Sequence, residues 1–447
     1  MKIARFSRIG FILAAAGSAV GLGNIWKFPY IAGQNGGGAF VFVYLITVFM
    51  IGFSVMLAEM LIGYLGRRDS VGSFEELAPR HKSLWKYGGF MSITGLVIMI
   101  FYSLVIGWIF HFIVLSFGPL PSSVSVAKET FDALIAADIG TQLFYHTAVF
   151  VIVTAVVARG IKGGIEKLNM ILMPVLFGIV GVMFLYATTL SGFGSAWHFM
   201  FTPDWSKLTS DSLVTAVGHA FFTLSLGMAS ILTYAASLPK GSNLVRSSLI
   251  VIALDTAIAL LAGLMLFTFL YEYGAAPSAG PGLVFISLPA VFYEMGALGN
   301  FFSLIFFVAL ASAGLTSAVS LVEPMVQYLI DRFGLSRFKA SLFSGLFFYL
   351  LGIIALLSIS KAYGKFFTFG SKSFFDWADF LTASVMLPMG GLLMALFVGH
   401  IIEKERVGAL LKRELGAFYS LWYFTLRYIV PIALVIVMLN LVGVVTF

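Results

Sequence analysis

Long runs of apolar residues dominate the pattern along this chain, and short polar segments separate them. A run of about 20 apolar residues is the length that an α-helix needs to cross the hydrocarbon core of a bilayer. The pattern therefore predicts an all-α integral membrane protein with about eleven transmembrane helices, over Ser7–Gly33, Gly38–Gly66, Lys86–Phe117, Leu143–Ala158, Gly164–Leu190, Asp211–Leu238, Ser242–Tyr271, Gly299–Asp331, Ala340–Ser360, Phe375–Ile402 and Ala417–Val445.

Two of these apolar runs are interrupted near their middle. Gly17–Pro29 places three glycines, a serine and an asparagine inside the first span, and Thr223–Ser230 interrupts the sixth. A membrane helix normally satisfies all of its own backbone groups, so such a break frees carbonyls for a cation and N–H groups for an anionic ligand. We interpret these breaks as parts of a transport site.

The breaks lie five spans apart, which is the sequence pointer to an inverted repeat. An odd number of spans in each half turns the halves in opposite orientations. We therefore expect one transporter domain with a first repeat over about 7–190, a second over about 211–402, and one extra helix over about 417–445.

Composition and charge agree with a membrane protein: 60% of the residues are hydrophobic and 11% are charged. The net charge of +7 does not indicate nucleic-acid binding, because the basic residues lie in short loops between spans. By the positive-inside rule, the N-terminus is expected to be cytoplasmic and the C-terminus outside. The polar segments Pro119–Gln142 and Glu272–Leu298 then lie outside, and we expect no cleaved signal peptide.

An intramembrane enzyme is not indicated. The histidines are scattered, and the chain has neither HExxH nor GxSxG. The most notable ionisable residue is Asp255, in mid-span. An ionisable side chain there costs at least about 2.5 kcal/mol on insertion scales, so a functional role is the default hypothesis.

Several motifs together carry a family resemblance. The segment Arg8–Phe40 contains GSAVGLGNIWKFPY and NGGGAF, and the motifs FTPDW, FFTLSLG, AGLTS and LPMGGL follow along the chain. This combination resembles the neurotransmitter:sodium symporter family, in its bacterial amino-acid branch, over nearly the whole chain. The resemblance implies a ten-helix core of inverted repeats with broken first and sixth helices, and one extra helix. It also implies a place in the inner membrane of a prokaryote.

The resemblance also implies two sodium sites, built from oxygen ligands as a hard cation prefers. The first would use the Ala19 carbonyl and the side chains of Asn24, Thr223 and Asp255, with the substrate carboxylate. The second would use the carbonyls of Gly17, Val20 and Ala313 and the hydroxyls of Thr316 and Ser317. From the residues alone, donation to the preceding helical turn is the favoured interpretation of these two hydroxyls, and only the remaining motifs favour a sodium site.

Chloride is not expected as a cofactor. Many relatives hold a neutral residue at the position of Asp255 and need chloride or a nearby glutamate to balance the cations. Here the negative charge is part of the chain, and Ala259 one turn later is neutral.

For the substrate, the resemblance implies an α-amino acid. N–H groups near Gly21–Gly23 and the Tyr102 hydroxyl would meet its carboxylate, and carbonyls near Phe222, Thr223 and Ser225 its ammonium group. Apolar residues would surround its side chain, which favours a hydrophobic or aromatic L-amino acid. The expected substrate residues are Ala19, Gly21, Leu22, Gly23, Ile98, Tyr102, Phe222, Thr223, Ser225, Met228, Ser317, Ala318 and Leu321.

Two gates are implied on the outer and inner sides. Lys27 matches the outer-gate arginine, with Asp376 or Asp379 as its partner, and Phe222 would close beneath it. Lysine cannot form the planar bidentate pair that arginine forms, so this gate is expected to be looser.

On the inner side, Asp331 would pair with Arg5 or Lys2. Arg5 stands where relatives carry a tryptophan, with Phe6 beside it, which leaves open whether an aromatic latch exists. Gly164 and Pro174 match the spacing of an unwinding motif in the fifth span.

The leading hypothesis is a symporter coupled to Na⁺, with two ions. Proton coupling through Asp255 and an amino-acid sensor that does not transport are the alternatives. A channel is disfavoured, because closed oxygen cages suit occlusion better than conduction. The sequence gives no indication of the oligomeric state or of any partner other than the amino acid and the lipid bilayer.

Overall fold

The computed structural model describes residues 5–275 and 282–444. In the first half of the chain the spans are formed by α1 (Arg8–Ala19), η1 (Gly23–Lys27), α2 (Phe28–Gln34), α3 (Gly38–Thr47), η2 (Val48–Gly52), α4 (Phe53–Gly66), α7 (Ile93–Leu115), α9 (Ile139–Ala158), η4 (Ile161–Glu166) and α10 (Lys167–Ala187). In the second half they are formed by α12 (Ser210–Thr223), α13 (Ser230–Ala236), α14 (Leu244–Glu272), α16 (Gly299–Phe333), α17 (Arg337–Ile359), α18 (Phe374–Leu381), η9 (Thr382–Met386), α19 (Leu387–Leu396), η10 (Phe397–Ile401), α21 (Tyr419–Phe424), η12 (Thr425–Ile429) and α22 (Val430–Leu441).

Shorter elements join these spans. They are α5 (Ser70–Leu77), α6 (Lys82–Trp85), η3 (Lys86–Ser92), α8 (Val124–Ala136), α11 (Phe193–Phe201), η5 (Trp205–Lys207), η6 (Leu283–Ser287), α15 (Leu288–Glu294), η7 (Gly296–Leu298), η8 (Gly364–Phe367), the hairpin β1 (Thr368–Phe369) and β2 (Lys372–Ser373), α20 (Lys404–Leu415) and η11 (Gly416–Phe418).

The membrane character predicted from the apolar runs is confirmed. Among the described residues, nine helices are long and apolar enough to cross a bilayer, and α1 with the η1–α2 helix forms a tenth span bent by 46°. The broken pair α12 and α13 accounts for the eleventh predicted span; each half is too short to cross a membrane alone. Among the described residues, most helix boundaries lie within a few residues of the predicted ones; Val445, the predicted end of the last span, lies outside the described residues.

The apolar pattern did not predict α8, the helix in the connection after α7. Within the polar segment after α7, Ser123 caps α8 by accepting from the Val126 N–H at 3.3 Å. This helix turns Phe131 inward, where its ring stacks on Phe285 with centroids 4.9 Å apart. Such a short amphipathic helix carries no long apolar run, so hydropathy alone indicates a loop there.

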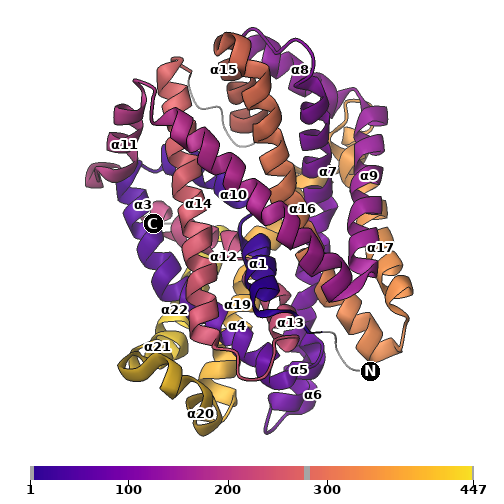
Figure 1. The fold of residues 1–447 in the computed structure, drawn as a ribbon. Helices are drawn as coiled ribbons and strands as arrows, with labels where there is room; N and C mark the ends of the chain where they lie inside the picture. Colours follow the sequence, from indigo (N-terminus) through magenta and orange to yellow (C-terminus); the bar gives the residue numbers. More distant parts are fainter. Residues whose placement is uncertain (1–4, 276–281, 445–447) are drawn as a thin grey trace.

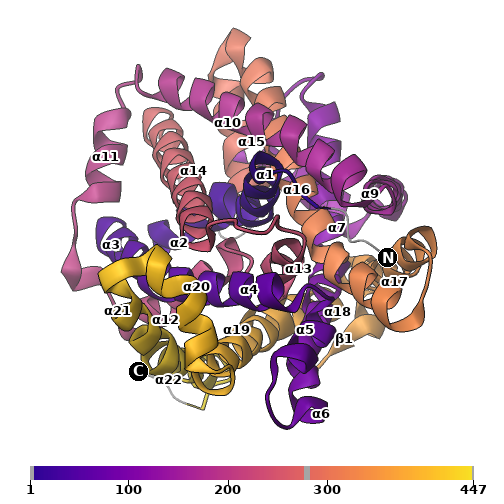
Figure 2. The same cartoon turned by 60° about the horizontal axis from the view of Figure 1, so that its bottom comes forward.

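Helix α1 lies at the centre of the molecule. It packs against α10, α13, α14 and α16, which surround it in both views (Figures 1 and 2). Helix α16 in turn packs along α7. A broken helix at this central place can present its freed backbone groups to several neighbours at once.

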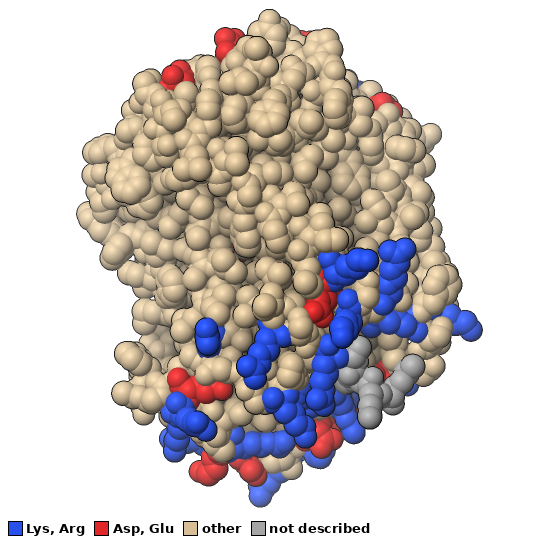
Figure 3. Space-filling view, viewed as in Figure 1, with Lys and Arg blue, Asp and Glu red and all other residues tan. Residues whose placement is uncertain are grey.

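Charge is distributed unevenly between the two ends. In Figure 3, lysine and arginine side chains gather over the lower end, where α1 begins and where α5 and α20 lie in Figure 1. The face above that end is almost free of charged side chains in this view. This is the distribution of a multi-pass membrane protein with one basic end.

Candidate functional site

The first break follows α1. Val20 leaves the helical conformation with ψ of 89°, and the next helical segment begins at Gly23. The side chain of Asn24 folds back over the gap, and its Oδ1 accepts from the Gly21 N–H at 2.9 Å. The break therefore satisfies one of its freed donors locally and leaves others directed toward neighbouring segments.

The second break lies between α12 and α13. Ser225, Gly227 and Ala229 all have positive φ angles, of 54°, 83° and 63°. This left-handed conformation is uncommon for residues other than glycine, so the segment holds real backbone strain at Ser225 and Ala229. The N–H of Gly227 donates to Glu59 Oε1 at 2.6 Å. This hydrogen bond gives a structural role to Glu59, a buried carboxyl group that is not part of either predicted sodium site.

Close backbone packing holds this second break against α19. A β carbon on Gly227 would lie 2.1 Å from the Leu387 carbonyl oxygen, and one on Gly390 would lie 1.8 Å from the Gly227 carbonyl oxygen. Only glycine allows these approaches. The LPMGGL motif is thus the surface against which the unwound segment rests.

Asp255 on α14 links both breaks. Its Oδ1 accepts from Asn24 Nδ2 at 2.7 Å and from Thr223 Oγ1 at 3.1 Å. The carboxyl group is fully buried. The structure thus brings three of the residues expected at the first sodium site into direct contact, with the Ala19 carbonyl in the adjacent turn. A set of carboxylate, amide, hydroxyl and carbonyl oxygens fits a hard cation.

The residues expected at the second sodium site meet where α1 and α16 cross. Ser317 Oγ donates to the Gly17 carbonyl at 3.2 Å and to the Ser18 carbonyl at 3.3 Å. Thr316 Oγ1 donates to the carbonyls of Ser312 and Ala313, both at 3.0 Å, so the back-bonding anticipated for this hydroxyl is present. Val20 and Ala313 are also fully buried. The oxygens suit Na⁺, and the role of each as a ligand stays a prediction.

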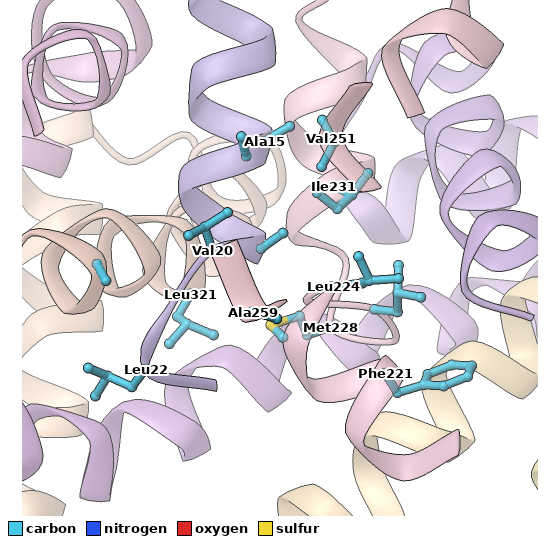
Figure 4. Close-up of a cluster of buried hydrophobic side chains, with 14 of the residues drawn as sticks. Ala15, Val20, Leu22, Phe221, Leu224, Met228, Ile231, Val251, Ala259 and Leu321 are labelled. Carbon is cyan, nitrogen blue, oxygen red and sulfur yellow. The ribbon is translucent and has the colours of Figure 1, made fainter. Parts of the chain in front are cut away.

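A small cavity of about 30 Å³ lies between the breaks. The residues expected around the substrate line it, with the exception of Ala318: Ala19, Gly21, Leu22, Gly23, Ile98, Tyr102, Phe222, Thr223, Ser225, Met228, Ser317 and Leu321. Figure 4 shows Leu22 and Met228, from the two breaks, and Leu321, with the other buried apolar side chains of this region.

Two differences from the expected lining are informative. Ala318 is buried in α16 but does not line the cavity. Successive helical residues point about 100° apart, so Ser317 and Leu321 share the cavity face and Ala318 turns away from it. Ser18 lines the cavity and was missed. Its carbonyl accepts from Ser225 Oγ at 2.6 Å, which joins the two breaks directly.

A larger cavity of about 300 Å³ lies on the other side of Phe222, and Lys27, Asp376 and Asp379 line it. Lys27 Nζ sits 4.3 Å from the centroid of the Phe222 ring, a cation–π contact. Within the described part of the chain, Lys27 forms no ion pair with either aspartate. Asp376 instead belongs to a capping box at the start of α18: its Oδ2 accepts from the Ser373 N–H at 3.2 Å, and Ser373 Oγ accepts from the Asp376 N–H at 3.1 Å. The structure therefore groups the expected outer-gate residues but pairs the lysine with the aromatic ring.

At the basic end, the expected ion pair of Asp331 is replaced by other contacts. Asp331 Oδ2 accepts from the Asp69 N–H at 3.0 Å, and Arg5 is exposed with no ion pair among the described residues. Lys2 lies outside the described residues. Nearby, Arg332 donates to Glu75 at 2.5 Å. This hydrogen bond lowers the pKa of Glu75, whereas burial raises the pKa of Asp69.

The expected unwinding motif lies at the start of the fifth span. Gly164 belongs to η4, and a β carbon there would lie 2.0 Å from the Val156 carbonyl oxygen of α9. Pro174 lies inside α10, where it removes one helical hydrogen bond. Glu166, at the end of η4, accepts from Ser7 Oγ at 2.5 Å and so holds this segment to the start of α1.

Comparison with known proteins agrees with this architecture. The profile of the Sodium:neurotransmitter symporter family matches residues 4–132 and 134–447. The sodium-dependent transporter YhdH of Bacillus subtilis is 38% identical, over 99% of this chain and 98% of its own length. A sodium-dependent transporter of Methanocaldococcus jannaschii is 33% identical, over 96% of this chain and 88% of its own length.

A solved structure is also similar. The crystal structure of MhsT in complex with L-phenylalanine matches with a TM-score of 0.90 and 39% identity, covering 99% of this chain and 100% of that chain. This likeness confirms the predicted fold with its broken helices. The chain belongs to the sodium:neurotransmitter symporter family and is therefore a multi-pass membrane transporter and not an enzyme.

Proposed function

We propose that this transporter is a sodium-coupled symporter that imports hydrophobic or aromatic L-amino acids by alternating access, without chloride. The observation that carries the proposal is the meeting of two helix breaks around one cavity with an apolar wall, beside the buried carboxyl group of Asp255. The breaks offer backbone donors and acceptors close together, which suits a zwitterion.

The substrate class follows from the cavity lining. Main-chain N–H groups at Gly21–Gly23 and the hydroxyl of Tyr102 provide donors for a carboxylate, and carbonyls of the second break provide acceptors for an ammonium group. Ile98, Met228 and Leu321 form an apolar wall, and no charged side chain among the described residues lines the cavity. The phenylalanine bound by MhsT, at 39% identity, supports an amino acid of this kind.

Sodium coupling is proposed through two ions. At the first site the substrate carboxylate would join Asn24, Thr223 and Asp255, so that ion and amino acid each raise the affinity for the other. Such coupling is reciprocal and typically about 1–3 kcal/mol. The fixed charge of Asp255 balances a cation within the chain itself, which supports independence from chloride.

Alternating access would move α1 and the η1–α2 segment separately, because the break between them uncouples the two halves of this span. On the outer side, Phe222 stands between the small and the large cavity, with Lys27 above its ring. We assign the basic end in Figure 3 to the cytoplasm by the positive-inside rule, which places the N-terminus there and the C-terminus outside. Similar transporters in bacteria and an archaeon support a prokaryotic inner membrane.

Uptake into proteoliposomes tests the proposal, with twenty amino acids as competitors. Hydrophobic and aromatic amino acids should compete best, uptake should require Na⁺, and gluconate should replace chloride without loss. Uptake that is unchanged when choline replaces Na⁺ and that follows a proton gradient would favour proton coupling through Asp255. Binding without accumulation would favour a sensor.

A chloride test on Asp255→Asn sharpens the result. Removing the fixed charge should raise the Na⁺ concentration needed for half-maximal uptake by about tenfold. This factor corresponds to the loss of about 1.4 kcal/mol of attraction between the carboxylate and the ion. We also expect chloride to restore part of the lost uptake. A wild-type chain whose uptake collapses in gluconate contradicts chloride independence, whatever the variant does.

A further inference from the structure

Asn169, on α10, has a buried amide oxygen that no part of the described chain satisfies. The side chain is fully buried. Its Nδ2 donates to the Ile165 carbonyl at 2.8 Å, whereas Oδ1 has no hydrogen-bond partner. Two acceptor oxygens would repel each other at this distance, so the contact with the Ile165 carbonyl identifies the nitrogen of this amide.

The unpaired oxygen faces the first helix next to its break. A β carbon on Gly17 would lie 2.0 Å from Asn169 Oδ1 and 3.0 Å from Thr316 Cβ. The amide oxygen therefore lies at the junction of α1, α10 and α16, against the glycine whose carbonyl accepts from Ser317. Three of the residues expected at the second sodium site surround this junction.

An unsatisfied buried acceptor costs about 1–3 kcal/mol. The nearby hydroxyls do not relieve it, because Thr316 and Ser317 donate to backbone carbonyls. A leucine of similar size would pack against Gly17 without that cost. An oxygen kept here at a cost suits a cation, which needs acceptors and no donors.

We propose that the amide oxygen of Asn169 contributes to binding Na⁺ at the second sodium site, either directly or through one bridging water. The inference rests on the sodium coupling proposed above. It adds α10 to a site otherwise formed by α1 and α16. Asn169 lies midway between Gly164 and Pro174, so unwinding of this stretch would withdraw the oxygen and release the ion toward the basic end.

Equilibrium binding of ²²Na⁺ to the purified full-length chain tests this without transport. Asn169→Leu should weaken the binding of one ion by about 10- to 100-fold, the range found when groups that support a metal site are removed. Asn169→Asp keeps the shape of the side chain and adds a negative charge, so it should tighten the binding of the same ion. Gln142→Leu on α9, whose side chain pairs with Trp108, is the control for losing a buried amide and should leave Na⁺ binding unchanged.

The outcomes separate this inference from the function on which it rests. If the wild-type chain binds no Na⁺, the sodium coupling itself is wrong. If the wild type binds Na⁺ and either folded Asn169 variant binds it equally well, the amide only fills space as a weak C–H···O partner of Gly17. That result overturns the role of Asn169 and leaves the proposed symport intact.

Discussion

The ring of Phe6 stands edge-on against the ring of Tyr234, with centroids 5.3 Å apart and planes at 71°. Phe6 is only 2% exposed, and its backbone N–H donates to the Ser237 carbonyl at 3.3 Å. These contacts hold the segment before α1 to the end of α13. The sequence leaves open whether an aromatic residue seals the basic end. In the structure Phe6 is buried there, whereas Arg5 is exposed.

Replacing Phe6 with alanine should open the basic end. The change removes the aromatic contact and a large buried area, a loss of about 3–5 kcal/mol for a buried phenylalanine. The chain contains no cysteine, so a single Ser320→Cys variant, at a fully buried position next to Ser18, reports access of a thiol reagent. We expect the rate of labelling from the basic side to rise at least about tenfold with Phe6→Ala, which corresponds to a shift of about 1.4 kcal/mol toward the open state. With Phe6→Tyr the rate should stay low. Equal labelling in all three chains would show that Phe6 is not a seal.

Met228 should set the size of the accepted side chain. It lies in the second break and lines the small cavity, where its flexible thioether adapts to irregular volumes. Met228→Phe should reduce the affinity for tryptophan relative to leucine by about 10- to 200-fold, the range for small changes of volume in an apolar pocket. Competition for uptake by the two amino acids measures the ratio. Met170→Phe, the same substitution at an exposed position of α10, is the matched control and should leave the ratio unchanged.

Much of this architecture could be predicted from the sequence, because backbone chemistry in a membrane is restrictive. Glycines and polar residues in mid-span leave few alternatives to a broken helix, and both breaks lie where the pattern placed them. Asp255 could be singled out in the same way, since a lone carboxyl group inside an apolar run needs partners.

Some contacts between distant segments could not be predicted. Asn169 looks like an ordinary helix residue until Gly17 is seen against its oxygen. The cation–π contact of Lys27 with Phe222 depends on how η1 lies against α12, which no spacing specifies. Ala318 lies outside the cavity lining, because a motif alone does not fix which face of a helix is turned toward a site.

Lys27 offers a direct test of the outer gate. A lysine reaches the face of Phe222, whereas an arginine has the planar fork that pairs with a carboxylate in two bonds. Lys27→Arg should therefore shift the cation to Asp376 or Asp379 and close the gate more tightly. We expect dissociation of bound amino acid to slow by about tenfold, since a charge-assisted pair contributes about 1.5–3 kcal/mol. The variants Asp376→Asn and Asp379→Asn in the Lys27→Arg background should show which aspartate is responsible. Unchanged dissociation in Lys27→Arg would mean that this residue does not gate release.

Pro174 tests whether local unwinding of the fifth span limits transport. It lies inside α10 and denies the helix one hydrogen bond, so Pro174→Ala should restore that bond and stiffen the helix. If the inner side opens by local unwinding of this stretch, the maximal rate of uptake should fall about tenfold. The added hydrogen bond, about 1 kcal/mol, and the loss of the ring clash together give an effect of this size. Equilibrium binding of Na⁺ and of the amino acid should stay the same. Gly178→Ala is the matched control, because it lies one turn later on the same exposed face with open space around it. A rate that falls equally in both variants would assign the effect to general stiffening of α10, and an unchanged rate in Pro174→Ala would place the rate-limiting movement elsewhere.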